Sequence, residues 1–139
     1  MGRVTVAVKI ENLQDLYLVD AGYRTLDQVR TMQVSDALVD TGATYLSVPA
    51  RFIVQLGLKH MSTRTSRTTA GTREVRVFSA VRLTIMERSC ICDVVELPDD
   101  CPVLIGQVPL ELVDYVVDLR NQRLTGNPAH NGEHMVELY

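Results

Sequence analysis

The sequence predicts a single, mainly β domain with one or two short helices. Apolar and polar residues alternate along several short segments, which is the pattern of strands that bury one face. Apolar residues at helical spacing occur around Phe52 and Val108 and, for a single turn, at Leu13, Leu16 and Tyr17. The length of 139 residues, of which 46% are hydrophobic and 22% charged, corresponds to about one globular domain. This length excludes a long two-domain enzyme.

Strands are expected along most of the chain. Alternation is strictest at residues 3–11, where Val4, Val6 and Val8 share one face. A second strand is expected at residues 31–39, and it becomes fully apolar before a polar triplet. Further strands are expected at residues 75–85, 91–97 and 103–105, and a final hairpin at residues 116–124.

The segments between these strands have weaker patterns. Residues 12–29 lack a clean period and are expected to form a loop or a short helix. Residues 59–73 are rich in Thr, Ser and Arg without apolar periodicity, which predicts a projecting loop. A helix is expected to begin at Pro49, because proline lacks the N–H that the first helical position leaves unused, and to end at Gly57. One or two helical turns are expected at residues 108–113.

Composition narrows the functional classes. The net charge of −3 and the absence of Trp argue against a nucleic-acid partner. No apolar run approaches the roughly 18 to 20 residues that cross a bilayer, and alternation after Arg3 is unlike a signal-peptide core. Three cysteines are too few for a disulfide framework and indicate a reducing compartment. We therefore expect a cytoplasmic protein without a membrane partner.

The polar triplet Asp40-Thr41-Gly42, followed by Ala43, is the strongest candidate site. A carboxylate at the end of a buried strand is partly desolvated, and a glycine beside it lets a second backbone approach closely. The Thr41 hydroxyl can donate to backbone across such an approach. The simplest alternative is a strand-to-turn junction in which the aspartate only binds the turn backbone.

A second short element, Leu104-Ile105-Gly106, also precedes helical turns. With both elements, the sequence resembles the retropepsin-like aspartic proteases over roughly residues 4–126. The resemblance implies a closed acid-protease barrel over residues 1–126, with residues 127–139 as a C-terminal tail. It also implies catalysis by Asp40, supported by Thr41, Gly42, Ala43, Leu104, Ile105 and Gly106.

One carboxylate cannot act as general acid and general base at once, so the chemistry needs two. The chain has a single such triplet, and none of its other aspartates precedes Thr-Gly or Ser-Gly. The expected enzyme is therefore a homodimer in which the two copies of Asp40 face each other and activate water for peptide-bond hydrolysis. No metal and no cofactor is expected.

The resemblance further implies a hairpin flap over the cleft, expected at residues 67–76 with its tip at Thr69, Ala70, Gly71 and Thr72. In this family the dimer often closes through a sheet built from the chain ends. Residues 4–10 and 135–139 are the candidates for that sheet. The resemblance to these proteases implies that the substrate is a polypeptide.

Other interpretations remain open at this level. A catalytically silent protein of the same fold would bind extended peptides by adding a strand. An enzyme that cuts only its own precursor or one partner is a third possibility. Cys90, Cys92 and Cys101 with two histidines could form a zinc site, although their spacing is atypical and buried free thiols are favoured. Arg64, Arg67, Arg73 and Arg76 could contact nucleic acid or an acidic peptide, but a solvated face is favoured, because Thr and Ser surround them and stacking aromatic residues are missing. Tyr45 and Tyr115 are expected to lie in the core or at a rim.

Overall fold

The fold is mainly β, as expected, in the computed structural model, which describes residues 3–135. The strands are β1 (Thr5–Asn12), β2 (Thr31–Val39), β3 (Leu46–Pro49), β4 (His60–Thr68), β5 (Gly71–Ile85), β6 (Arg88–Leu97), β7 (Leu104–Ile105), β8 (Tyr115–Asp118) and β9 (Arg123–Gly126). The α-helices are α1 (Leu13–Asp20), α2 (Ala50–Gln55) and α3 (Gln107–Val113). Two single-turn 3-10 helices cover Leu26–Gln28 and Pro128–His130.

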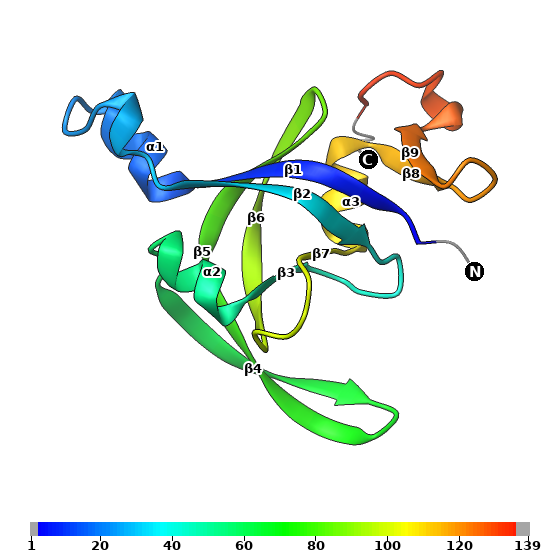
Figure 1. The fold of residues 1–139 in the computed structure, drawn as a ribbon, viewed down its shortest axis with the longest axis horizontal. Helices are drawn as coiled ribbons and strands as arrows, with labels where there is room; N and C mark the ends of the chain where they lie inside the picture. The colour runs from blue at the N-terminus through cyan, green and yellow to red at the C-terminus, as the bar shows by residue number, and fades with distance from the viewer. Residues whose placement is uncertain (1–2, 136–139) are drawn as a thin grey trace.

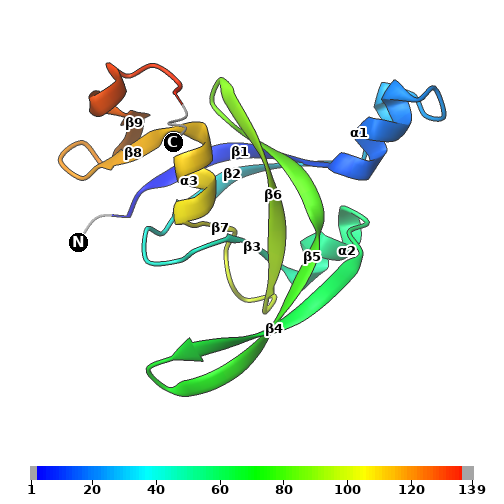
Figure 2. The same ribbon diagram turned by 180° about the vertical axis from the view of Figure 1, so that it is seen from behind.

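Six strands close into a ring in the order β1, β2, β7, β3, β6, β5, because β1 pairs with both β2 and β5 (Figures 1 and 2). The ring mixes antiparallel pairs with the parallel pairs β2–β7 and β3–β6. Strand β4 pairs with β5 outside the ring, and β8 and β9 form a separate hairpin. The expected closed barrel is therefore corrected to a mixed, irregular ring with two hairpins attached.

The alternating residues found in the sequence fill the interior of this ring. Ile10 of β1 and Leu83 of β5 are fully buried and are register partners. Leu46 of β3 and Ile105 of β7 are also fully buried and oppose each other. Most of this core thus comes from the predicted strands, since period-two segments place every second side chain on the inner face. Strand β3 was not predicted, because all four of its residues are buried and leave no alternation in the sequence.

The described chain has three α-helices where one or two were expected. The additional helix, α1, lies in the segment that lacked an apolar period. Its first turn is capped by Asn12, whose Oδ1 accepts from the N–H of Asp15 at 3.1 Å. The fully buried Asp15 carboxylate accepts from Arg30 Nε at 2.9 Å and from Arg30 Nη2 at 3.0 Å. Polar contacts distant in sequence therefore hold α1, and a hydrophobic period does not reveal them.

Two boundaries differ from the expectation. Pro49 is the last residue of β3 and the N-cap of α2, so the helix begins one residue later than predicted. The segment 59–73, expected as a loop, contains β4, which pairs with β5 from His60 opposite Phe78 to Thr68 opposite Gly71, with an irregularity between His60 and Ser62. This segment lacks an apolar period because the hairpin projects from the ring and both of its faces are largely polar (Figure 1).

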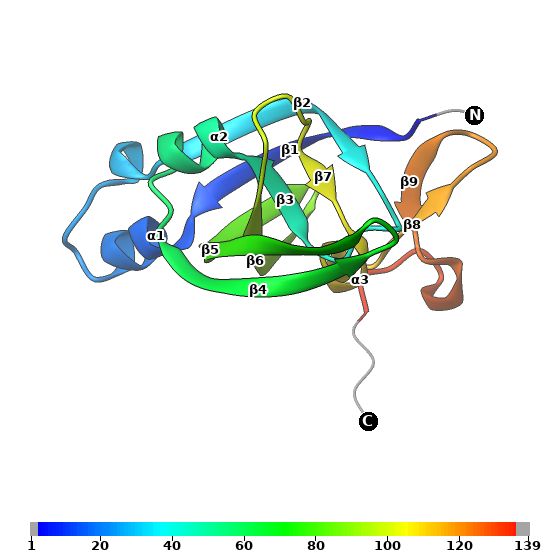
Figure 3. The same cartoon turned by 90° about the horizontal axis from the view of Figure 1, so that it is seen from below.

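Helix α1 and the loop that follows β2 lie at opposite ends of the molecule (Figures 1 and 3). Helix α1 lies at one end, and the N-terminal end of β1, the loop after β2 and the β8–β9 hairpin lie at the other (Figures 1 and 3). The tip of the β4–β5 hairpin also points toward this second end (Figure 3). Within residues 3–135, no helix is long and apolar enough to cross a bilayer.

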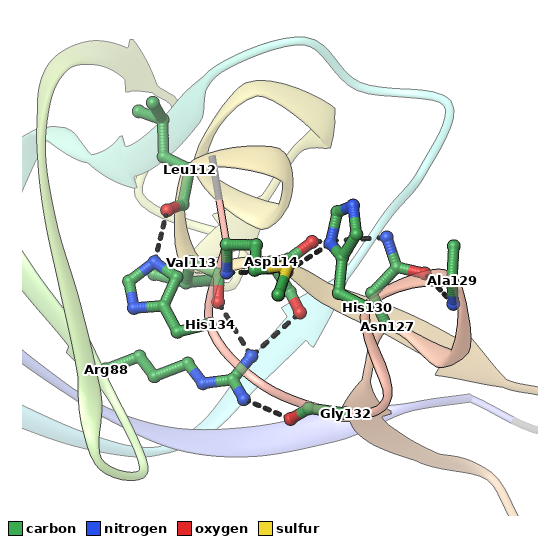
Figure 4. A network of polar contacts seen from close by, with 10 residues as sticks. Arg88, Leu112, Val113, Asp114, Asn127, Ala129, His130, Gly132 and His134 are labelled. Carbon is green, nitrogen blue, oxygen red and sulfur yellow. Dashed lines mark hydrogen bonds and ion pairs between the residues drawn. The ribbon is translucent and has the colours of Figure 1, made fainter. Parts of the chain in front are cut away.

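Residues 127–135 of the predicted tail contact the end of α3 through Asp114 (Figure 4). Asp114 caps α3 in the left-handed conformation with φ 59° and is 6% exposed. Its carboxylate lies 2.6 Å from His130 Nδ1 and accepts from Asn127 Nδ2 at 3.1 Å and from the N–H of Met135 at 3.0 Å. The expected dimer strand over residues 135–139 lies largely outside the described residues.

Arg88, in the first position of β6, reinforces this contact from the other side. Its guanidinium donates to the carbonyls of Val113, Asp114 and Gly132 and stacks 4.4 Å from the centroid of the Tyr115 ring. The tail is therefore fastened to the helix that follows Gly106, and Tyr115 is a half-buried residue beneath an arginine.

The Asp114 carboxylate makes the stability pH-dependent. Burial opposes its ionisation, but hydrogen bonds from Met135, His130 and Asn127 outweigh burial and hold its pKa at about 2, below its ordinary value of 3.8. Because the folded state favours the ionised form, the stabilisation is complete above about pH 4 and is lost as the pH falls through about 2. We expect Asp114→Asn to lower the melting temperature at about pH 6 and to match the wild type near the acidic limit.

Thermal unfolding from about pH 6 to about pH 2 measures this difference. Glu133→Gln is the control, because Glu133 is an exposed tail carboxylate, and it is expected to keep the wild-type pH profile. If the melting temperature of Asp114→Asn lies below that of the wild type by the same amount at every pH, the assigned role of the carboxylate is contradicted.

Candidate active site

Asp40 follows the last residue of β2 and is held by β7. Leu38 and Val39 pair in parallel with Leu104 and Ile105, and the N–H of Asp40 donates to the carbonyl of Ile105 at 3.0 Å. The apolar strand end predicted before the triplet, in which Ala37 is buried and Leu38 and Val39 are half-buried, thus delivers the half-buried residue Asp40 to the rim of the ring.

The triplet forms a tight turn around its own carboxylate. The N–H of Gly42 donates to Asp40 Oδ1 at 3.0 Å, and the N–H of Ala43 donates to the Asp40 carbonyl at 3.0 Å. Thr41 and Gly42 are exposed. The turn therefore fixes the direction of the carboxylate and leaves its neighbouring residues open to solvent.

The structure brings the two predicted motifs together at Gly106. The N–H of Gly106 donates to the carbonyl of Tyr45 at 3.0 Å, and the next two N–H groups, of Gln107 and Val108, donate to the carbonyls of Ala43 and Thr44 at 2.8 and 2.9 Å. A Cβ at position 106 would lie 2.5 Å from the Tyr45 carbonyl oxygen. Only glycine allows this approach, which locks the loop after Asp40 to the start of α3.

A groove of about 560 Å³ lies beside Asp40 and Thr41. Its walls come from the start of β1, the end of β2, α3 and β8. The aliphatic lining residues are Val4, Leu38, Val39, Leu110, Val116, Val117 and Leu119. Asp40 supplies the single carboxylate among the residues that line this groove. Sequence reasoning missed α3 and β8 as walls, because only the fold brings them to the triplet.

The predicted flap is a hairpin, and its tip is where the sequence suggested. Thr69 and Ala70 form the turn between β4 and β5, with Gly71 at φ 119°. Thr68 Oγ1 donates to the Gly71 carbonyl at 2.8 Å and accepts from the N–H of Ala70 at 3.2 Å. Residues 69–72 do not line the groove beside Asp40. Within one chain the hairpin therefore does not close over the carboxylate.

Tyr45 connects the base of this hairpin to the loop after Asp40. Its hydroxyl accepts from Arg64 Nη1 of β4 at 3.4 Å, and the side chain is 37% exposed. Of the two expected positions, core or rim, this exposure excludes the core. The connection to Arg64 was not predicted, because the two residues belong to different elements.

The cysteines and histidines do not form a metal cluster. Cys90 and Cys92 are free, half-buried thiols on one face of β6, whereas His130 and His134 lie on the tail beside α3. The hydrogen bond with Cys90 and burial both raise the pKa of the Cys92 thiol, which disfavours a thiolate there. Among residues 3–135, no three side chains of His, Cys, Asp or Glu are placed to hold a metal ion.

Comparison with protein-family models and with curated proteins finds no significant match to this chain. Function is therefore inferred from the geometry of the loop at Asp40 and of the groove beside it.

Proposed function

We propose that the protein is an aspartic endopeptidase that is active as a homodimer of retropepsin type. The observation that carries the proposal is the half-buried Asp40 carboxylate, fixed by the Gly42 N–H in a loop locked to Gly106 and facing a groove with no other carboxylate. The lock makes the loop rigid, and a second copy would bring the second acid that the reaction requires.

In the proposed reaction the two copies of Asp40 share one proton, as paired carboxylates in aspartic proteases do. The ionised copy takes a proton from water, and the resulting oxygen nucleophile attacks the carbonyl carbon of the peptide. The protonated copy gives its proton to the carbonyl oxygen. The copy that took the proton from water then gives it to the leaving nitrogen, the other copy takes a proton from a hydroxyl of the intermediate, and the C–N bond breaks, which restores the pair with one shared proton.

The exposed apolar surface at this end of the molecule supports dimerisation. Leu119, which directly follows β8, is 78% exposed and lines the same groove as Asp40. Val116 and Val117 beside it are half-buried. A second copy across a two-fold axis would cover these side chains while it brings its own Asp40 to the site. We also propose a cytoplasmic location, which the three free thiols support.

A catalytically silent peptide-binding protein is the rival proposal. Strand β4 lies at the end of the sheet, with β5 as its paired neighbour, so an extended peptide could add to its outer edge. Binding of this kind would not need the Asp40 carboxylate. Cleavage that depends on Asp40 therefore separates the two proposals.

Mixing wild-type protein with an Asp40→Asn variant tests whether two copies build one site. If subunits exchange freely and both carboxylates are required, an equal amount of variant lowers the activity of a fixed amount of wild type to about half. A tenfold excess lowers it to roughly a tenth. The activity is measured as initial cleavage rate on a peptide library after subunit exchange.

Asp36→Asn is the matched control, because Asp36 is an exposed residue of the same strand. The double variant with both substitutions is expected to inhibit like Asp40→Asn alone, and Asp36→Asn alone is expected not to inhibit. Native mass spectrometry detects whether subunits exchange. If they exchange and the wild-type cleavage rate stays the same when Asp40→Asn protein is added, the proposal of a shared site is overturned.

A further inference from the structure

The two faces of the β4–β5 hairpin differ in burial. Ser62 and Ser66 of β4 and Val75 of β5 are half-buried, and Val77 is buried. These residues share one face, because Ser62 opposes Val77 and alternate residues of a strand point to the same side. The residues of the other face in the projecting part are all exposed: Thr63, Thr65, Arg67, Thr72, Glu74 and Arg76. The first set therefore forms an inner face, directed toward the body of the protein.

The four arginines of the hairpin divide equally between these faces. Arg64 opposes Val75, and Arg73 opposes Ser66, so both belong to the inner face. Contact between Arg64 Nη1 and the Tyr45 hydroxyl at 3.4 Å also places this face against the loop that follows Asp40. Arg67 and Arg76 oppose Thr72 and Thr63 on the outer face.

The outer face is balanced in charge, and the inner face is not. On the outer face, Arg76 pairs with Glu96 at 3.2 Å, and Glu74 is a diagonal neighbour of Arg67. On the inner face, Arg64 and Arg73 are themselves diagonal neighbours. Within residues 3–135 neither of them forms an ion pair. Two adjacent positive charges repel each other and attract an anionic group from outside.

We propose that Arg64 and Arg73 select polypeptide segments that carry acidic side chains near the bond to be cut. This inference rests on the proposed endopeptidase function and names its substrate class. A guanidinium binds a carboxylate through paired hydrogen bonds, so Glu or Asp in the substrate is the complementary group. The two residues are specificity-determining and take no part in the proton transfers at Asp40.

The experiment compares peptide pairs that differ only by Glu or Gln at each position flanking the cleaved bond. At about pH 6 the glutamates are ionised. Wild-type protein is expected to cleave the preferred acidic peptide with a kcat/KM about tenfold above that of its Gln partner. The ratio is expected to fall as salt is added, because exposed charges are screened. In the double variant Arg64→Gln with Arg73→Gln the ratio is expected to approach one.

Arg67→Gln is the matched control, since it removes a charge from the outer face of the same hairpin, and it is expected to keep the wild-type ratio. Wild-type cleavage of both peptides at equal rates would overturn this inference and leave the endopeptidase proposal standing. Loss of the ratio in Arg67→Gln as well would also overturn it, because the preference would then follow net charge alone. Cleavage of no peptide by the wild type would instead count against the endopeptidase itself.

Discussion

Replacing Asp40 by Asn is expected to lower peptide cleavage by about a thousandfold or more without unfolding the protein. The amide cannot ionise, so neither copy can take a proton from water. The side-chain oxygen of Asn can still accept from the Gly42 N–H, which Asp40 Oδ1 accepts at 3.0 Å. Initial cleavage rates and the thermal unfolding midpoint of the same preparation measure the two halves of this prediction.

Asp36→Asn again provides the control, because it makes the same chemical change on an exposed part of β2. Its activity and its unfolding midpoint are expected to match those of the wild type. If Asp40→Asn remains folded and cleaves at the wild-type rate, Asp40 is not the catalytic acid and the proposed function fails. If wild type and variant bind peptides equally and neither cleaves, the silent binding protein is favoured.

Replacing Gly106 by Ala is expected to destabilise the fold by about 3 kcal/mol or more. The new Cβ would lie 2.5 Å from the Tyr45 carbonyl oxygen and 2.6 Å from the Thr44 carbonyl carbon. Both atoms belong to the backbone, so no side-chain rotation relieves the overlap. Since a domain of this kind is stable by about 5 to 15 kcal/mol, the loss is large. Chemical denaturation gives the free energy of unfolding of both proteins.

Gly22→Ala is the control for the Gly106→Ala variant, because it shows how much stability is lost when a glycine without close neighbours is replaced by alanine. Gly22 has φ +85° and no neighbouring atom within 4 Å of a built Cβ, so its substitution meets backbone strain but no overlap. We expect a cost of about 1 kcal/mol there. Gly106 has φ −88°, which alanine adopts without strain, so its loss comes from the overlap alone. Equal costs at the two positions would contradict the close approach of the two loops.

Local patterns explain why much of the fold could be predicted. Strand β2 spans the predicted residues 31–39, and β1 follows the valines that share one face. These strands bury one face against the ring, so burial leaves a period of two in the sequence. Strand β4 was missed because it projects from the ring, where neither face must be apolar.

For a related reason, the sequence did not distinguish a loop from a helix at α1. The helix is held by the Asn12 cap and by the ion pair of Asp15 with Arg30 at 2.9 Å, fifteen residues away. Such contacts depend on where the chain returns, and a hydrophobic pattern carries no information about that. The same holds for Asp114, whose partners Asn127, His130 and Met135 lie on the tail.

The sequence by itself determined five of the six ring strands, all but β3, and the two short motifs at Asp40 and Gly106, because local periodicity and glycine chemistry depend on neighbouring residues. Tertiary structure alone decided that these motifs touch, that α3 and β8 form the walls of the groove at Asp40, and that two of the hairpin arginines face inward. Contacts of this kind depend on ring closure and strand register, which are set by the packing of distant segments and not by any one of them.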